Sequence, residues 1–360
     1  MKVICFLYLT CAAGVASAGT TFNVTDLGSL GGSAAQAFGL NASGQAVGSA
    51  SNLFGYTHAF SSSGSGMTDL TLNTGASEGM ASGINSAGQI VGTQFVNGQA
   101  IATTWINGTP HSIAGAGSYG TAINDSGQIT GMLPDGQAFV MSNGSLAGFG
   151  AYSWSSGYGI NSSGQVAGYG ETAPGVFRGF VWTPSTGYVA LGTLGGTNSY
   201  AMGINDAGQV VGNAQLTSGY SHAFLWSGGA MQDLGTLGLS SFAYGINAAG
   251  NVVGYSYVDG ASHAFLFENG VMLDLNTLID SSSGWVLTAA YAINASGQIA
   301  GSGLFNGVEH AFRLDYVDGY SDVASTVSTP EPATWSIAVM GLALIVGSRI
   351  RIRPRRPRQP

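Results

Sequence analysis

Four histidines recur at one position of this 360-residue chain, and each opens the tripeptide His-Ala-Phe. Histidine binds zinc and exchanges protons near neutral pH, so a matched set suggests a metal or catalytic ring. The competing interpretation is structural, with each imidazole linking strands or neighbouring units. Equivalent positions of a ring-shaped repeat protein lie far apart unless they line its centre, which favours the structural role. The four are His58, His222, His263 and His310.

Acidic residues occur in two settings. The turn sequences Asn124–Gly127 and Asn205–Gly208 carry one aspartate each, which is few for calcium, an ion that takes about six to eight oxygen ligands. Three loop acids, Asp135, Glu171 and Asp259, break the repeat pattern. A pair of carboxylates flanking a sugar bond could hydrolyse or eliminate a glycan, and solvated loop charges are the alternative. Serines occur without a Gly-x-Ser-x-Gly elbow, so we assign no catalytic, cofactor or metal residue.

Aromatic residues gather in one irregular stretch of the chain. Trp154, Tyr158 and Tyr169 could form a surface on which sugar rings stack. The alternative is that they pack in the core, where aromatic residues of strands usually lie.

Positive charge is nearly absent from the body of the chain. Between Gly19 and Thr329 the basic residues are Arg178 and Arg313, and acids outnumber them. Such a surface is a poor partner for phosphate backbones, which argues against nucleic-acid binding. Its many Ser, Asn, Thr and Gly residues suit contact with neutral polymers, including carbohydrate, and equally suit an inert surface.

A ten-residue phrase organises the chain, and Gly203–Gly212 is among its clearest copies. In it Asn205-Asp206-Ala207-Gly208 separates two short apolar runs. Asn at the first turn position and Gly at the fourth favour a type I turn followed by a left-handed residue, as in a hairpin with a G1 bulge. The phrase therefore predicts a β-hairpin.

The phrase occurs seven times, at separations of 44, 39, 37, 44, 42 and 47 residues between its asparagines. A β-rich period near this length is typical of a four-stranded propeller blade. In the clearest unit we expect strands at Ala201–Ile204, Gln209–Ala214, Ser221–Trp226 and Gly229–Leu234. The asparagines are Asn41, Asn85, Asn124, Asn161, Asn205, Asn247 and Asn294.

The order of the phrases predicts how the ring closes. An Asp-Leu-Gly phrase typical of a fourth strand stands at Asp26, before any hairpin, whereas the last unit, from Ala289 to Leu314, lacks a fourth strand. Pairing of Phe22–Leu27 with His310–Leu314 would complete the last blade and remove exposed sheet edges. We predict an all-β, seven-bladed propeller of about 40-residue repeats, spanning residues 19–317. An open solenoid and a ring of six or eight blades are the alternatives.

The combination of His-Ala-Phe with Gly-Ile-Asn-x-x-Gly-Gln resembles the extracellular repeat family named for its His-Ala-Phe signature. The resemblance covers nearly all of the chain after its N-terminal segment, although three of the seven copies lack the histidine. It implies export and a repeated β fold, and it implies no established activity.

The first 18 residues have the pattern of a secretory signal peptide. Lys2 precedes an apolar run, and Ala16-Ser17-Ala18 forms a small-residue cleavage site for signal peptidase. The alternatives are a membrane anchor and a lipoprotein signal at Cys11. Both cysteines, Cys5 and Cys11, lie here, so the processed protein would have no disulfide and no thiolate site.

The C-terminal end has three parts. A linker at residues 318–329 leads to Pro330, Glu331 and Pro332, then to an apolar run from Trp335 to Gly347 and an arginine-rich tail. Residues 330–360 resemble the PEP-CTERM sorting signal of Gram-negative bacteria. That resemblance implies recognition by an exosortase, transient insertion of the apolar helix into the inner membrane, and an association with exopolysaccharide. An ordinary single-span anchor is the alternative.

Together these features predict an exported protein that is extracellular or held at the cell surface. We expect a non-enzymatic binding or matrix-structural module around extracellular polysaccharide. The alternative is a propeller-type glycan hydrolase or lyase that uses the loop acids Asp135, Glu171 and Asp259.

Overall fold

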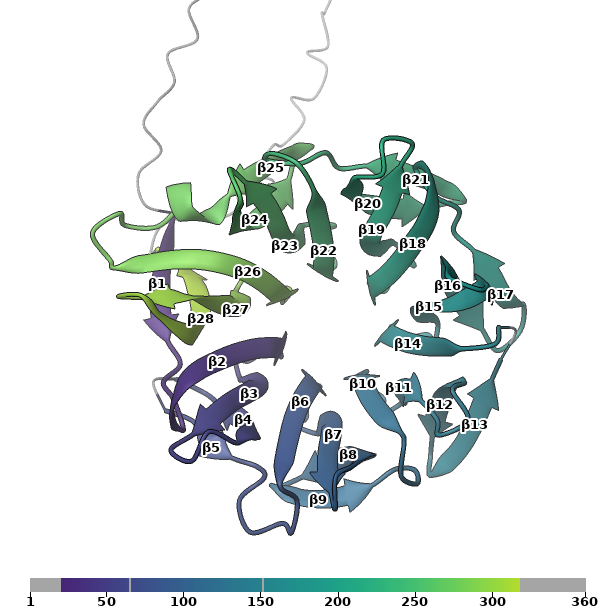
Figure 1. Ribbon diagram of the computed structural model, residues 1–360, viewed down its shortest axis with the longest axis horizontal. Helices are drawn as coiled ribbons and strands as arrows, with labels where there is room; N and C mark the ends of the chain where they lie inside the picture. Colours follow the sequence, from purple (N-terminus) through teal and green to yellow (C-terminus); the bar gives the residue numbers. More distant parts are fainter. Residues whose placement is uncertain (1–20, 65, 151, 318–360) are drawn as a thin grey trace, which may run out of the picture. The chain divides into compact units, whose positions relative to one another are not determined.

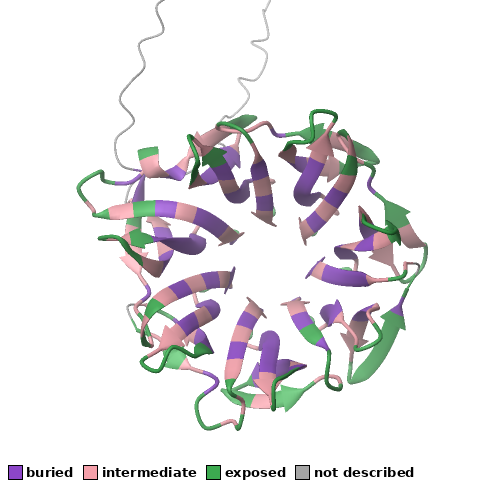
Figure 2. Ribbon diagram, viewed as in Figure 1, coloured by how far each residue is buried: buried purple, intermediate pink, exposed green. Residues whose placement is uncertain are grey.

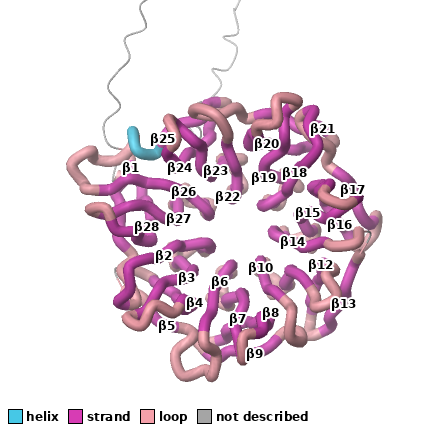
Figure 3. The backbone as a smooth tube through the Cα atoms, in the orientation of Figure 1, coloured by secondary structure: helices cyan, strands magenta, loops and turns pink. Residues whose placement is uncertain are grey.

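The computed structural model describes residues 21–64, 66–150 and 152–317, which form seven four-stranded antiparallel sheets around a common centre (Figure 1). The fold is a seven-bladed β-propeller, as the repeat count predicts. Within the described residues the one helical element is a 3-10 turn, η1 (Leu275–Thr277), at the outer edge of the ring (Figure 3).

Blades 1 to 3 each run from an inner first strand to an outer fourth strand. Blade 1 comprises β2 (Gly31–Leu40), β3 (Ala46–Asn52), β4 (Thr57–Ser62) and β5 (Thr68–Asp69). Blade 2 comprises β6 (Glu78–Ile84), β7 (Ile90–Val96), β8 (Gln99–Ile106) and β9 (Thr109–Ser112). Blade 3 comprises β10 (Tyr119–Ile123), β11 (Ile129–Met132), β12 (Ala138–Ser142) and β13 (Ser145–Phe149).

Blades 4 to 6 repeat this order, and blade 7 takes its outer strand from the start of the chain. Blade 4 comprises β14 (Ser155–Ile160), β15 (Val166–Ala173), β16 (Val176–Thr183) and β17 (Gly187–Ala190). Blade 5 comprises β18 (Gly195–Ile204), β19 (Val210–Leu216), β20 (Ser221–Ser227) and β21 (Ala230–Asp233). Blade 6 comprises β22 (Ser241–Ile246), β23 (Val252–Val258), β24 (Ala261–Glu268) and β25 (Val271–Asp274). Blade 7 comprises β26 (Trp285–Ile293), β27 (Ile299–Phe305), β28 (Val308–Tyr316) and β1 (Phe22–Asp26).

Strand β1 closes the ring. It pairs antiparallel with β28 from Phe22 opposite Tyr316 to Asp26 opposite Phe312. The backbone N–H of Val317 also donates to the carbonyl of Thr21 at 3.0 Å. The predicted closure by the N-terminal strand is therefore confirmed, and the last blade has no open edge at β28.

The repeated turn has the predicted geometry. In blade 5 the N–H of Gly208 donates to the Asn205 carbonyl at 3.0 Å, and the N–H of Asn205 donates to the Gln209 carbonyl at 3.0 Å. Gly208 has a φ of 73°, which glycine adopts at little cost. We call the side of the ring that carries these seven turns the turn face. The hairpins between second and third strands lie on the opposite side, the hairpin face.

The hydrophobic core lies between neighbouring blades. One cluster joins Ala223 and Leu234 of blade 5 to Ala243, Val252 and Phe265 of blade 6. The alanine and phenylalanine of His-Ala-Phe point to opposite faces of the sheet because side chains alternate along a strand. The alanine permits close approach to the next blade, and the phenylalanine fills the space toward the previous one. Figure 2 shows the buried residues concentrated in the second and third strands of the blades, whereas the innermost strands alternate between buried and intermediate residues.

The strand boundaries differ modestly from prediction. In blade 5 the first strand begins at Gly195 rather than Ala201, and the second begins at Val210 rather than Gln209. The first strand starts earlier because Gly195 also pairs with the second strand, beyond a register shift. The stretch Gly195–Asn198 has no alternating apolar residues, so the sequence pattern did not predict this extension.

Several predictions fall outside the described residues. These are the signal peptide with Ala16 and Ala18, the linker, and the sorting segment with Pro330, Glu331 and Pro332. In the part of the chain that the structure describes, no helix is long and apolar enough to span a bilayer.

Candidate functional site

Each His-Ala-Phe histidine contacts an aspartate of its own blade. The Nδ1–carboxylate distances are 2.7 Å for His58 and Asp69, 2.9 Å for His222 and Asp233, 2.7 Å for His263 and Asp274, and 3.0 Å for His310 and Asp26. The contact joins the third strand to the fourth, as the structural interpretation requires. Among the described residues, no three His, Cys, Asp or Glu side chains are grouped so that they could hold a metal ion.

The sequence contains a signal for these histidine–aspartate contacts. The four repeats with the histidine are the four with the aspartate, and the other three lack both. Pairing registers place Ser112, Gly148 and Ala190 at the aspartate position of those three repeats. Aligning the repeats would therefore have predicted these contacts.

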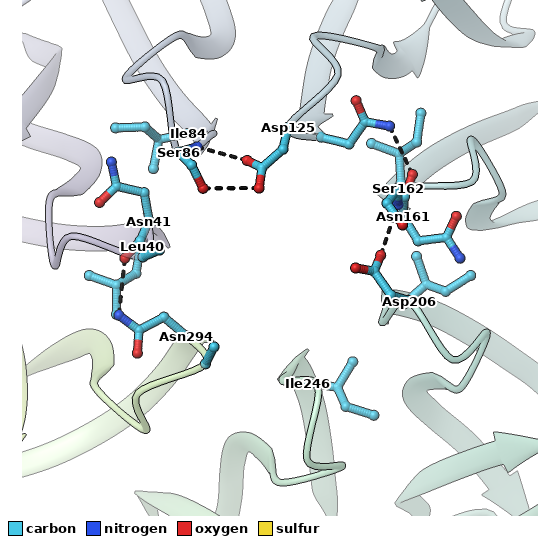
Figure 4. A pocket seen from close by; sticks show the side chains of 15 residues that line it. Leu40, Asn41, Ile84, Ser86, Asp125, Asn161, Ser162, Asp206, Ile246 and Asn294 are labelled. Atoms are coloured by element: carbon cyan, nitrogen blue, oxygen red, sulfur yellow. Dashed lines mark hydrogen bonds between the residues drawn. The ribbon is translucent and has the colours of Figure 1, made fainter.

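A belt of asparagines surrounds the turn-face end of the central channel (Figure 4). The side-chain amide of each turn asparagine donates to the backbone carbonyl of the asparagine in the next blade, at 2.8–3.4 Å. The series is unbroken, because Asn294 of blade 7 donates to Asn41 of blade 1. All seven asparagines are buried. Sequence reasoning found their turn role and missed this link between blades.

The turn aspartates also join blades. Asp125 accepts hydrogen bonds from the N–H and hydroxyl of Ser86 at 2.8 and 2.9 Å, and Asp206 accepts from the N–H of Ser162 at 2.8 Å. Figure 4 shows both carboxylates turned toward these serines at the rim of a cavity of about 320 Å³. Blade-to-blade contacts therefore account for these acids.

The three aromatic residues singled out in the sequence do come together. The rings of Tyr158 and Tyr169 stack with centroids 4.9 Å apart, and their hydroxyls are 3.0 Å apart. Trp154 lies 5.5 Å from the Tyr169 ring, and all three side chains are half-buried.

The aromatic surface continues across four further blades. Tyr200 lies 4.9 Å from Tyr169, centroid to centroid, and 5.8 Å from Phe177. A second run joins Tyr255 to Tyr244 at 5.9 Å, Tyr244 to Tyr291 at 5.3 Å, and Tyr291 to Phe38 at 5.2 Å. We call this set the aromatic arc: Phe38, Trp154, Tyr158, Tyr169, Phe177, Tyr200, Tyr244, Tyr255 and Tyr291.

Five tyrosines of the arc have pKa values raised above the ordinary value of tyrosine: Tyr169, Tyr200, Tyr244, Tyr255 and Tyr291. Burial raises the pKa of Tyr169, and the nearby Tyr158, Tyr200 and Tyr244 raise it further. Burial likewise raises the pKa values of Tyr244, Tyr255 and Tyr291. Each phenol can therefore both donate and accept a hydrogen bond. Tyr158 of the first run and Tyr244 of the second line one cavity, which places the two runs on the same part of the ring.

Two cavities border the arc. One, of about 320 Å³, is lined by residues of blades 2 to 4, including Met80, Tyr119, Met132, Trp154 and Tyr158. The other, of about 250 Å³, lies in the channel, where Tyr158, Tyr244 and Tyr291 share the wall with aliphatic side chains. Tyr158 borders both, so the arc connects a lateral pocket to the channel.

The three loop acids lie in separate hairpins of the hairpin face. Asp135 is in blade 3, Glu171 in blade 4, and Asp259 in blade 6, with blade 5 between the last two. Glu171 accepts from the N–H of Gly175 at 2.8 Å, and Asp135 from the N–H of Gln137 at 3.1 Å. Hydrogen bonds within their own turns account for the carboxylates of Asp135 and Glu171. Asp259 lies two blades from Glu171, so only Asp135 and Glu171 are candidates for a pair that flanks one sugar bond.

Sequence reasoning missed most of the arc. Tyr158, Tyr244 and Tyr291 each stand three residues before the turn asparagine of their blade, and Tyr169 and Tyr255 each stand eight after it. This shared placement was available as a signal. The interpretation of strand aromatics as core residues concealed it.

The fold and the arc together define a closed seven-bladed β-propeller with an aromatic surface around its channel. No protein-family model matches the chain, and no curated protein does either.

Solved structures share the architecture at low identity. The β-propeller domain of the Trilobed protease from Pyrococcus furiosus, whose topology is described as open velcro, is 10% identical. The match covers 80% of this chain and 99% of that one, with a TM-score of 0.52. This likeness shows the fold alone, and the closure by β1 distinguishes the present chain from an open ring.

Two further matches have lower scores. A puromycin-hydrolyzing peptidase from Mycobacterium tuberculosis is 12% identical over 80% of this chain, with a TM-score of 0.49. TolB from Acinetobacter baumannii is 11% identical over 63% of this chain, with a TM-score of 0.46. The present chain spans 50% of that peptidase and 61% of TolB.

Proposed function

We propose that this protein is an exported, non-enzymatic propeller that binds extracellular polysaccharide through the aromatic arc. The observation that carries the proposal is the two runs of half-buried rings, from blades at opposite ends of the sequence, that border one cavity in the channel. Aromatic faces stack on the C–H faces of sugar rings, and protonated phenols supply hydrogen bonds to hydroxyl groups.

The two ends of the described chain lie together on one face of the ring. Thr21 and Val317 are hydrogen-bonded to each other at the turn face, where β28 ends and β1 begins. The hairpin-face end of the arc, marked by Trp154, lies on the other side of the ring.

Affinity electrophoresis in gels containing single polysaccharides tests the binding. Trp154→Ala and Tyr200→Ala should each weaken retention, with Kd raised about tenfold, or about 1.4 kcal/mol. Phe54→Ala is the matched control, because Phe54 is 84% exposed on a hairpin outside the arc. Equal retention of all variants would contradict the proposal, and steady release of sugar products lost in Glu171→Gln would favour the hydrolase or lyase alternative.

Export and sorting have their own test. We propose that signal peptidase cleaves after Ala18 and that an exosortase recognises Pro330, Glu331 and Pro332. Mass spectrometry of the protein from its native host should then find Gly19 at the N-terminus, and Glu331→Ala should accumulate as an uncleaved membrane-associated form. Unchanged processing of that variant would contradict the sorting assignment.

A further inference from the structure

We infer that the aromatic arc selects neutral glycans with all-equatorial linkages and rejects their uronic-acid counterparts. The inference rests on the proposed function and concerns the charges that flank the arc.

One acid stands beside each end of the arc. The backbone N–H of Glu171 donates to the Trp154 carbonyl at 2.8 Å, and its carboxylate accepts from the Ser153 hydroxyl at 3.2 Å. At the other end Glu309 accepts from the side-chain amide of Gln36 at 2.7 Å. Gln36 and the arc residue Phe38 flank the buried Ala37 on β2, so their side chains share one face of the sheet and Glu309 lies beside that end of the arc.

Cations do not balance these acids. Arg178 and Arg313 are the only Lys or Arg residues in the described part of the chain. Arg178 lies beside the arc, but its guanidinium donates to the backbone carbonyls of Phe177 and Thr197. Arg313 forms an ion pair with Asp315 at 3.0 Å and donates to the Gly44 carbonyl on the turn face. Arg178 keeps its charge, so a bound carboxylate would meet two acids and one arginine, and the charge that flanks the arc stays net negative.

The stacking geometry favours flat sugar rings. A pyranose whose substituents are all equatorial exposes C–H groups on both faces, so its rings can lie against the phenyl planes. Exchanging the hydroxymethyl group of each sugar for a carboxylate, as in a uronic acid, leaves the ring shape unchanged and adds one negative charge per ring. Charges within about 8 Å of one another are only partly screened at physiological salt, so Glu171 and Glu309 would oppose the acidic polymer.

A matched pair of ligands tests this selectivity. Cellohexaose is a neutral hexamer with equatorial linkages, and the glucuronate hexamer with the same linkages differs only in its carboxylates. Isothermal titration at low salt should show cellohexaose binding about tenfold more tightly, or about 1.4 kcal/mol. The difference should shrink at about 1 M salt, where the screening length falls to about 3 Å.

Variants identify the charges responsible. Glu171→Gln with Glu309→Gln should narrow the difference between the two hexamers without weakening cellohexaose. Glu268→Gln is the control, because Glu268 accepts from Asn251 in a hairpin at the turn face. This inference alone would be overturned if the glucuronate hexamer bound as tightly as cellohexaose or more tightly. It would also be overturned if the difference in affinity between the two hexamers stayed the same at high salt and in the variants. Binding of neither hexamer would overturn it together with the proposed function.

Discussion

At the scale of single residues, the His-Ala-Phe histidines act within their blades. Each imidazole meets an aspartate of the adjacent outer strand, and in blade 7 that aspartate is Asp26 of the closing strand. The pairs therefore fasten the outer strands, including the one that seals the ring.

A double-mutant cycle should detect this coupling. His263→Ala and Asp274→Ala, 2.7 Å apart in the native protein, should show an interaction energy of about 1 kcal/mol in urea unfolding. His263→Ala combined with Asp233→Ala, a residue of another blade, should be additive. Additivity in both cycles would contradict a stabilising contact.

The arc tyrosines should make the fold sensitive to alkali. Their pKa values are raised in the folded protein, so the unfolded chain loses these protons first. The contribution of these tyrosines to stability should be constant below about pH 10, the ordinary pKa of tyrosine, and should be lost as the pH rises beyond it. Urea midpoints across this range measure the effect. Tyr169→Phe with Tyr255→Phe should flatten the decline, and an equal decline in that variant would assign it to other groups.

At the scale of elements, the ten-residue phrase sufficed to predict hairpins, strand order and blade number. Its turn chemistry is local: Asn205 and Gly208 act within five residues, so their roles are visible in sequence. Contacts between blades are not local. The donation from Asn205 to Asn247 and the stacking of Tyr169 near Tyr200 depend on the radius of the ring and on which face of a sheet each side chain occupies.

The asparagine belt gives a sharp prediction for one turn. Asn205→Asp keeps an oxygen that can accept from the Gln209 N–H and loses the donor to the Asn247 carbonyl. A carboxylate buried against that carbonyl and the Gln209 side-chain oxygen should cost about 1–3 kcal/mol. Thermal unfolding measures the loss. Ala207→Ser, in the same turn and exposed, should change stability little, and equal effects of the two variants would contradict the role of the belt.

At the scale of the whole molecule, closure joins residues that are far apart in sequence. A disulfide between Val24→Cys and Leu314→Cys, which face each other in the β1–β28 register, would lock the ring. By loop entropy it should stabilise the protein by about 5.7 kcal/mol, against about 2.5 kcal/mol for Leu225→Cys with Gln232→Cys inside blade 5. The free energy of unfolding, measured with and without reductant, gives the stabilisation by each disulfide. Failure of the closing pair to oxidise would contradict the pairing of the chain ends.

Glycan binding at the arc can be observed directly, one tyrosine at a time. Fluorotyrosine NMR of the protein, titrated with the polysaccharide that retains it, reports each tyrosine separately. We predict that the resonances of Tyr158, Tyr169 and Tyr200 shift together and saturate, whereas those of Tyr56 and Tyr220, exposed in hairpins outside the arc, stay fixed. Shifts confined to Tyr56 and Tyr220, with the arc unchanged, would contradict the central claim that this surface binds glycan.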